Sequence, residues 1–167
     1  MKKMTEKALN EAFAGESMAH MKYLAFAAQA EKEGFKKVAN LFKAIAYAEQ
    51  VHATNHAKTL GLLKKTVENL QAGIDGESFE IEEMYPAYKA TAELQGEKTA
   101  LRMIVWALES EKDHQTMYKE ALEKVANGED VDFDEVYVCP VCGHTHIGKP
   151  TEKCPLCGVP AEMYVKF

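Results

Sequence analysis

Apolar and polar positions along residues 5–127 repeat with the period of long amphipathic helices. This stretch is rich in Ala, Leu, Glu, Lys and Met, and only Pro86 interrupts it. Gly34, Gly61, Gly96 and Gly128 each follow a helical stretch, where a glycine can take the left-handed conformation that ends a helix. The pattern predicts four helices in an antiparallel bundle, at roughly residues 5–33, 35–60, 77–95 and 97–127.

We expect the segment from Leu62 to Gly76 to be the only long connection inside the bundle. It separates two helical hairpins whose sequences look like copies of each other. Gly-Glu-Ser at 15–17 recurs at 76–78, an offset of 61, whereas Glu49-x-x-His52 recurs as Glu111-x-x-His114, an offset of 62. The difference predicts a one-residue slip within the third helix near Pro86, where proline removes a backbone donor.

Acidic and imidazole side chains interrupt the apolar stripes of these helices. On the second helix, Glu49 and His52 continue the stripe of Leu41 and Ile45, and on the fourth helix the second Glu-x-x-His pair continues a stripe that begins at Ile104. Glu16 lies on the stripe of the first helix, and the third offers two glutamates one turn apart. We expect these side chains to point inward: Glu16, Glu49, His52, Glu77, Glu80, Glu111 and His114.

Five ionised carboxylates in an apolar core repel one another and lose their hydration, so cations are needed to hold them. Two ferrous ions bring about four positive charges against a formal charge of about minus five. A Glu from each of two helices and Glu-x-x-His from each of the other two is a di-iron or di-manganese ligand set, and zinc would bind without cycling. A Glu-x-x-His pair on a solvated face is the alternative for a single pair, but two matched copies favour the metal site.

Four further residues lie near the predicted ligands. His20 and His56 are one turn from Glu16 and His52, but the second hairpin does not repeat them, so we prefer a surface or supporting position for them over a ligand role. Tyr23 and Tyr85 are repeat partners. Either hydrogen bonding to the carboxylates or ordinary core packing accounts for the two tyrosines.

All four cysteines lie in the last 29 residues, as two Cys-Pro-x-Cys-Gly units. This pattern predicts one tetrahedral metal held by Cys139, Cys142, Cys154 and Cys157. A disulfide framework is the less favoured reading, because the chain shows no export signal. Both iron and zinc accept four thiolates, and the neighbouring redox-capable site favours iron, with zinc possible in a heterologous preparation. With a strand expected at Val136–Val138, we predict a bundle domain at 1–134 and a metal domain at 135–167.

Charge and hydropathy exclude several classes of partner. The net charge is -6, which argues against nucleic acid as the main partner because phosphate binding needs a basic surface. No apolar run is long enough for a bilayer, and the N-terminus resembles no secretion signal, so we expect a cytoplasmic protein without a membrane partner. The chain also lacks a nucleotide-binding glycine motif, so NAD(P)H is not expected to bind directly.

Several motifs together resemble the rubrerythrin family: FAGES at 13–17, AEQVH at 48–52, GESFEIEEMYP at 76–86, ESEKDH at 109–114 and the two CPxCG units. The resemblance covers nearly the whole chain. It implies a ferritin-like four-helix bundle with a di-iron centre, followed by a small rubredoxin-like β/loop domain with one iron. It also implies that the seven Glu and His residues named above are iron ligands, and that one iron exchanges Glu80 for His52 on reduction.

The resemblance further implies a peroxidase that reduces hydrogen peroxide to water in oxidative-stress defence. Electrons would pass from NAD(P)H through a reductase or rubredoxin to the rubredoxin-like iron and then to the di-iron centre. The resemblance also implies a homodimer. Some members of the family exchange helical hairpins between the two chains of the dimer. Two rival functions stay open: a ferroxidase or iron-handling protein, and a non-catalytic interaction module whose cysteines bind zinc.

Overall fold

The computed structural model describes all 167 residues and divides the chain into two compact units, Met1–Lys64 and Lys65–Phe167. The fold is mainly α-helical with a small strand-and-loop segment at its C-terminal end, as the sequence predicts. The domain boundary after residue 134 stays a prediction. None of the helices is both long and apolar enough to cross a membrane.

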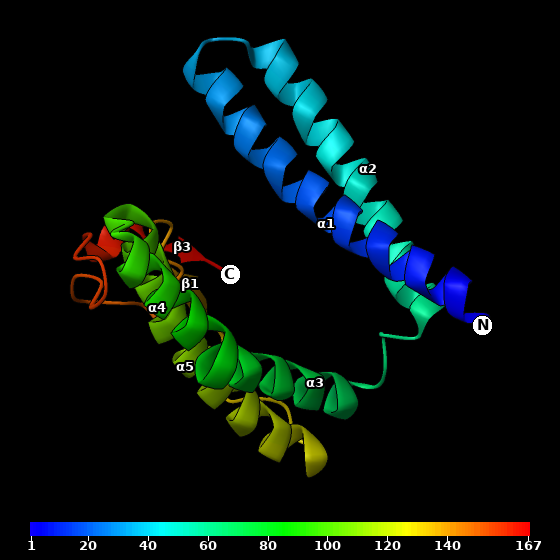
Figure 1. Ribbon diagram of the computed structural model, residues 1–167. Helices are drawn as coiled ribbons and strands as arrows, with labels where there is room; N and C mark the ends of the chain where they lie inside the picture. Colours follow the sequence, from blue (N-terminus) through cyan, green and yellow to red (C-terminus); the bar gives the residue numbers. More distant parts are fainter. The chain divides into compact units, whose positions relative to one another are not determined.

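The Met1–Lys64 unit is a hairpin of two long helices, α1 (Lys3–Lys32) and α2 (Lys36–Leu60), which lie side by side (Figure 1). Gly34 joins them at φ 87°, and Gly61 ends α2 at φ 73°, so both take the left-handed conformation expected of them. Every buried residue between the two helices is an alanine, and the small side chain lets the helices approach closely. These are Ala27, Ala30, Ala39, Ala46, Ala53 and Ala57.

Larger apolar side chains of this hairpin are exposed. Leu41 is 60% exposed and Ile45 is 39% exposed, so the prediction that their stripe is buried is wrong for the single chain. The reason is that α2 packs on α1 through its alanines, which occupy a neighbouring face of the helix. The stripe that carries Glu49 and His52 is therefore available to a further surface.

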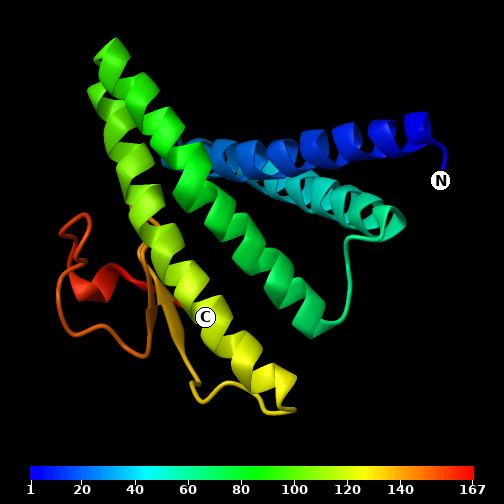
Figure 2. The same ribbon diagram turned by 60° about the horizontal axis from the view of Figure 1, so that its bottom comes forward.

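The Lys65–Phe167 unit begins with a second helical hairpin (Figure 2). Its first arm consists of α3 (Thr66–Phe79), the π-helix η1 (Glu80–Met84) and α4 (Tyr85–Gln95), and its second arm is α5 (Lys98–Ala126). Gly96 joins the two arms at φ 69°.

The third predicted helix starts earlier than the sequence indicated. The prediction of a long connection through Gly76 is wrong, because α3 already begins at Thr66. The backbone N–H of Lys65 donates to a Glu68 carboxylate oxygen at 3.3 Å, which satisfies one free donor at the helix start. Gly73 does not break the helix. A Cβ there would lie 3.1 Å from ring carbons of Tyr118 on α5, so this glycine permits close packing of α3 on α5.

The π-helix explains the difference between the two repeat offsets. Glu80–Met84 lies between the Gly-Glu-Ser repeat and Pro86, and its backbone bonds run from Tyr85 N–H to the Glu80 carbonyl. A π-turn accommodates one residue more than an α-turn. The slip predicted near Pro86 is thereby confirmed, and its cause is an inserted residue.

The C-terminal segment is a three-stranded antiparallel sheet with the order β2-β1-β3. The strands are β1 (Val136–Val138), β2 (Thr145–Ile147) and β3 (Val165–Lys166), and the 3₁₀-helix η2 (Ala161–Met163) precedes β3. The strand predicted at Val136–Val138 is confirmed. A small core of Cys139, Cys154 and Tyr164 lies at this end of the unit.

Candidate metal centres

In the Met1–Lys64 unit, α1 and α2 bring Glu16, Glu49 and His52 together, with potential ligand atoms all within 4.8 Å of one another. His52 Nδ1 lies 3.1 Å from Oε2 of Glu49 and 4.0 Å from Oε1 of Glu16. The Glu49 side chain is 17% exposed, whereas that of His52 is 55% exposed. Three of the predicted ligands thus form one group on this hairpin.

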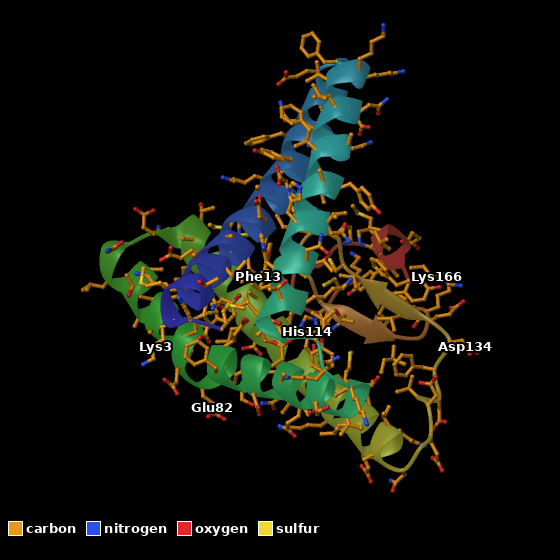
Figure 3. The ribbon with its side chains drawn as sticks, turned by 90° about the vertical axis from the view of Figure 1, so that its right-hand side faces the viewer. Lys3, Phe13, Glu82, His114, Asp134 and Lys166 are labelled. Carbon is orange, nitrogen blue, oxygen red and sulfur yellow. The ribbon has the colours of Figure 1, made fainter.

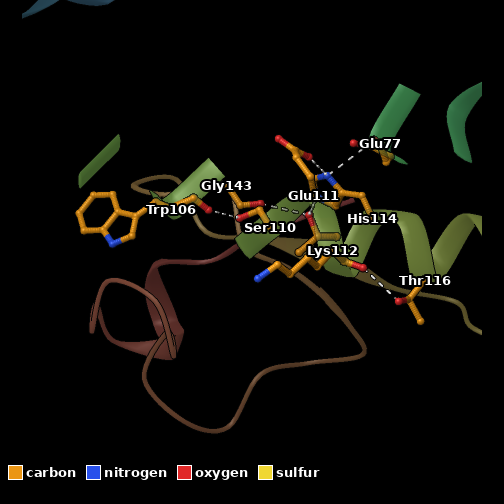
Figure 4. A network of polar contacts seen from close by, with 9 residues as sticks. Glu77, Trp106, Ser110, Glu111, Lys112, His114, Thr116 and Gly143 are labelled. Atoms are coloured by element: carbon orange, nitrogen blue, oxygen red, sulfur yellow. Dashed lines mark hydrogen bonds and ion pairs between the residues drawn. The ribbon is translucent and has the colours of Figure 1, made fainter. Parts of the chain in front are cut away.

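The Lys65–Phe167 unit contains the matching group of Glu77, Glu111 and His114 (Figure 4). His114 Nδ1 lies 2.6 Å from Oε2 of Glu111 and 4.0 Å from Oε1 of Glu77. These carboxylates are 16% and 17% exposed. The two groups have the same composition and the same Nδ1-facing geometry, as the repeat in the sequence predicts.

Burial and neighbouring carboxyl groups shift the pKa values of glutamates in both groups. Burial, followed by the charge of Glu111, raises the pKa of Glu77 from 4.5 to about 7. In the other group a hydrogen bond between the two carboxyls raises the pKa of Glu16 and lowers that of Glu49, so Glu16 is the carboxyl of this pair that holds a proton more readily. A bound cation would replace that proton.

Glu80 stands at the start of the π-helix and belongs to the same surroundings without being one of the three clustered residues. Burial is the main cause that raises the pKa of Glu80, and the negative charge of Glu111 raises it further. Burial and the charge of Glu80 also raise the pKa of Tyr85. By contrast, Glu82 on the same π-helix is exposed (Figure 3). The structure therefore places Glu80 and Tyr85 beside the Glu77 group and Glu82 outside it.

The donor set fits divalent metal ions. Each group offers two carboxylates and one imidazole nitrogen, ligands that suit iron and manganese. Without a cation the two carboxylates of each group lie close enough to share or retain a proton, which is the condition that metal binding relieves. Together with Glu80, the two groups contain all seven side chains predicted as ligands of the di-metal site.

The four cysteines form the third metal group, with all Sγ atoms within 4.8 Å of one another. The shortest separations are 3.5 Å between Cys139 and Cys157 and 3.4 Å between Cys142 and Cys154. A metal tetrahedron with bonds of about 2.3 Å has edges of roughly 3.8 Å, so small movements suffice for one ion. All four thiols are free, which contradicts the disulfide alternative.

Two backbone turns place hydrogen-bond donors near the cysteine sulfurs. Gly143 at φ 85° and Gly158 at φ 78° close two equivalent turns, in which the glycine N–H donates to the carbonyl of Cys139 or Cys154. Burial opposes ionisation of Cys154, but hydrogen bonds from Tyr164 and the backbone outweigh it and lower its pKa to about 6. The turns thus aim donors at the sulfurs, as expected.

The remaining candidates near the di-metal groups take supporting positions. His20 Nδ1 donates to the carbonyl oxygen of Ala46 at 2.8 Å and so joins α1 to α2. Tyr23 packs against Phe26 and Phe42, with ring centroids 6.1 Å and 6.2 Å away, which favours core packing for this tyrosine. His56 lies near Glu16, where it slightly opposes the rise in the pKa of that carboxyl caused by the hydrogen bond with Glu49.

Two polar contacts around the sites were not apparent from the sequence. The Thr145 hydroxyl oxygen lies 2.8 Å from Nε2 of His114, and His144 Nδ1 lies 2.7 Å from the Tyr164 hydroxyl oxygen. The two residues of each contact are 31 and 20 positions apart in the sequence, respectively. Only the tertiary fold brings them together. Histidines adjacent to a Cys-x-x-Cys-Gly turn were the one available signal.

Comparison with known proteins agrees with this arrangement of sites. The family model described as Rubrerythrin matches residues 7–122, and that of the rubrerythrin rubredoxin-like domain matches residues 137–165. Rubrerythrin-2 of Clostridium acetobutylicum is 40% identical over 98% of this chain and 97% of its own length. Nigerythrin of Nitratidesulfovibrio vulgaris is 34% identical over 95% of this chain and 84% of its own.

Solved structures give the same result. Nigerythrin in a partially reduced state and in a fully reduced, all-ferrous state each superpose with a TM-score of 0.58. Both are 31% identical to this chain and cover 98% of it, and the chain covers 86% of each of them.

Proposed function

The chain belongs to the rubrerythrin family, with candidate sites for a di-iron centre and for a rubredoxin-like iron, and from that premise we propose that it reduces hydrogen peroxide to water. The observation that carries the proposal is the pair of matched Glu-Glu-His groups in a chain that also holds a four-thiolate group. Iron storage needs no built-in one-electron relay, and a non-catalytic scaffold has no use for two redox-capable sites of different kinds.

Under this proposal the iron ligands are the seven side chains predicted from the sequence. Two ferrous ions, if bound by these side chains, would supply the two electrons that O–O cleavage consumes and Lewis acidity toward the peroxide oxygens. The carboxylates of Glu77 and Glu111 hold the ions in a partly buried position. Tyr85, whose hydroxyl keeps its proton because burial and Glu80 raise its pKa, offers a hydrogen-bond donor beside these carboxylates.

Cys139, Cys142, Cys154 and Cys157 would hold an iron that could pass single electrons in the proposed reaction. Reduction of one hydrogen peroxide to two waters consumes two electrons and two protons. An NAD(P)H-linked reductase or a rubredoxin would supply these electrons. The thiolate group and the Glu77 group lie in the same Lys65–Phe167 unit. That shared unit supports a built-in relay. The cytoplasmic location expected from the sequence stays part of the proposal.

We also propose a homodimer, because the unit that carries three of the seven predicted ligands leaves an apolar helix face exposed. Glu16, Glu49 and His52 lie on a hairpin whose apolar stripe is exposed, with Leu41 at 60%. A hairpin of this kind gains stability by covering that stripe. Sedimentation analysis of the full chain measures the oligomeric state, and a monomer under all conditions would contradict the homodimer.

The test of the activity is rapid mixing of the fully reduced, iron-loaded protein with peroxide or with oxygen. We expect peroxide to oxidise the four-thiolate iron within the turnover time and oxygen to do so more slowly. Equal rates with both oxidants would favour the ferroxidase alternative. Glu80→Ala should slow peroxide turnover and leave the absorbance of the four-thiolate iron unchanged, with Glu82→Ala as the exposed control on the same π-helix.

A further inference from the structure

His114 has a different partner at each of its ring nitrogens. Nδ1 faces the carboxylates of Glu111 and Glu77, at 2.6 Å and 4.0 Å. Nε2 lies 2.8 Å from the Thr145 hydroxyl oxygen, on strand β2 of the C-terminal sheet. The ring therefore connects the candidate di-metal group on α5 with the cysteine-rich segment.

The hydroxyl of Thr145 also has a second partner, which determines the direction of this contact. Its oxygen lies 3.2 Å from the carbonyl oxygen of Gly143. A carbonyl oxygen can only accept, so the single hydroxyl proton is donated to Gly143, and the Thr145 oxygen accepts a proton from Nε2–H of His114. The 2.6 Å contact between Nδ1 and Glu111 Oε2 needs a proton as well, and a metal ion that displaces this proton takes the Nδ1 lone pair while the N–H stays on Nε2.

We propose that Thr145 is a positioning residue for the di-metal site: it holds His114 in the Nε2–H tautomer and orients Nδ1 for metal binding. The inference rests on the proposed function insofar as it assumes that the Glu77 group binds metal. It adds that a side chain of the rubredoxin-like segment sets the geometry of a ligand on the helical hairpin. Metal-binding histidines depend on such partners for their tautomer and ring orientation.

The cysteine turn fixes the position of Thr145. The residue pairs with Val138 in the β1–β2 ladder, and the neighbouring His144 carbonyl accepts the Cys139 N–H at 2.9 Å. Gly143, the acceptor of the threonine proton, closes that turn at φ 85°. The hydroxyl is thus held by backbone that surrounds the four-thiolate group rather than by a free loop.

The surroundings make this hydrogen bond hard to replace. His114 and Thr145 line a largely apolar pocket of about 450 Å³, together with Leu70, Met117 and Val131. An N–H that loses the threonine oxygen there would have to rely on water, which holds the ring orientation less firmly. His52, the equivalent histidine, contacts Glu49 in the same way through Nδ1 but is 55% exposed and has no side-chain partner at Nε2 within its own unit. Only one of the two histidines is anchored.

The experiment compares full-length wild type with Thr145→Val, which keeps the shape and removes the hydroxyl, Thr145→Ala, and Thr145→Ser, which restores it. Zinc alone is the probe, because it is diamagnetic and redox-inert. Long-range ¹⁵N–¹H correlation spectra report the ring tautomer of His114, and competition with a chelator reports zinc affinity of the helical site. Thr151→Val, at an exposed threonine of the same segment, is the matched control.

We expect wild type and Thr145→Ser to show an Nε2–H signal for His114 that exchanges slowly with water. Thr145→Val and Thr145→Ala should lose that slow exchange and bind zinc at the helical site about 10 to 100 times more weakly. Zinc at the four cysteines and the Thr151→Val protein should be unaffected. The alanine variant answers the question if the valine variant misfolds.

Unchanged zinc affinity and an unchanged Nε2–H signal in both hydroxyl-free variants would overturn the positioning role while leaving the di-metal site intact. Wild-type protein that binds zinc at the cysteines but none at the helical site would overturn the proposed function as well. The two failures are therefore distinguishable.

Discussion

The hydroxyl oxygen of Tyr164 lies 2.7 Å from Nδ1 of His144 and is also hydrogen-bonded to Cys154. A thiolate can only accept, so the tyrosine O–H is donated to the sulfur and its oxygen accepts from Nδ1–H of the histidine. The two aromatic rings, with centroids 6.0 Å apart and an interplanar angle of 89°, are buried beside the four-thiolate group. This hydrogen-bond chain, which runs from His144 through Tyr164 to Cys154, stabilises negative charge on the Cys154 sulfur.

Removing the hydroxyl by Tyr164→Phe should therefore lower the reduction potential of the four-thiolate iron, on the order of tens of millivolts, because hydrogen bonds to sulfur favour the more negative reduced state. Spectroelectrochemistry of the visible bands measures the shift. Tyr137→Phe is the control, since its hydroxyl donates to a Glu135 oxygen at 3.0 Å. Equal potentials for the two variants would show that the Tyr164 contact has no such influence.

The raised pKa of Glu77 predicts that the iron-free protein loses stability as the pH rises. Folding raises this pKa from 4.5 to about 7, so the contribution is fully present below pH 4.5 and is lost as the pH passes through 7. The loss amounts to at most about 3 kcal/mol of unfolding free energy. Urea denaturation at pH 5 and pH 8 measures it.

In Glu77→Gln this loss should be absent, because the amide does not titrate. Glu82→Gln, at an exposed position of the neighbouring π-helix, should behave like wild type. A Glu77→Gln protein whose stability falls with pH as steeply as that of wild type would contradict the assignment.

The π-helix predicts a specific effect of a one-residue deletion. Removing Glu82 from Glu80–Met84 converts the segment to an α-helical register, which turns the preceding part of the arm by about 100° relative to Tyr85. We expect iron at the helical site to fall from two ions per site toward none, with one iron retained at the cysteines. Iron analysis together with the visible spectrum decides this, and Glu82→Ala, which keeps the residue count, is the control.

Two glycines within α3 predict opposite tolerance of a methyl group. A Cβ at Gly76 meets no atom within 4 Å, and Gly76→Ala should stabilise the protein by about 0.5–1 kcal/mol through helix propensity. At Gly73 the added Cβ lies 3.1 Å from the Tyr118 ring, so Gly73→Ala should be the less stable of the two variants. Paired urea titrations compare them, and equal stabilities would mean that the ring moves away freely.

Much of this architecture follows from local sequence signals. The glycines at the helix ends, the Cys-x-x-Cys-Gly turns and the strand at Val136–Val138 take the predicted conformations. The two Glu-x-x-His pairs each gather one further glutamate, because their spacing places both side chains on one face of a helix.

The errors arise where tertiary packing decides. Gly73 reads as a helix breaker from the sequence, yet the ring of Tyr118 on a distant helix makes glycine the residue that fits. Leu41 reads as core, yet α2 packs through alanines instead. The contact between Thr145 and His114 joins residues 31 positions apart, and no local pattern announces the sheet that brings them together.

The packing of α1 on α2 through alanines limits the stability of this hairpin by itself. Methyl groups remove little apolar surface from water, so the hairpin draws only modest free energy from its own closure. In the homodimer proposed above, association and metal binding would both stabilise the folded hairpin, so the thermal midpoint of this region is expected to rise with protein concentration and with added metal.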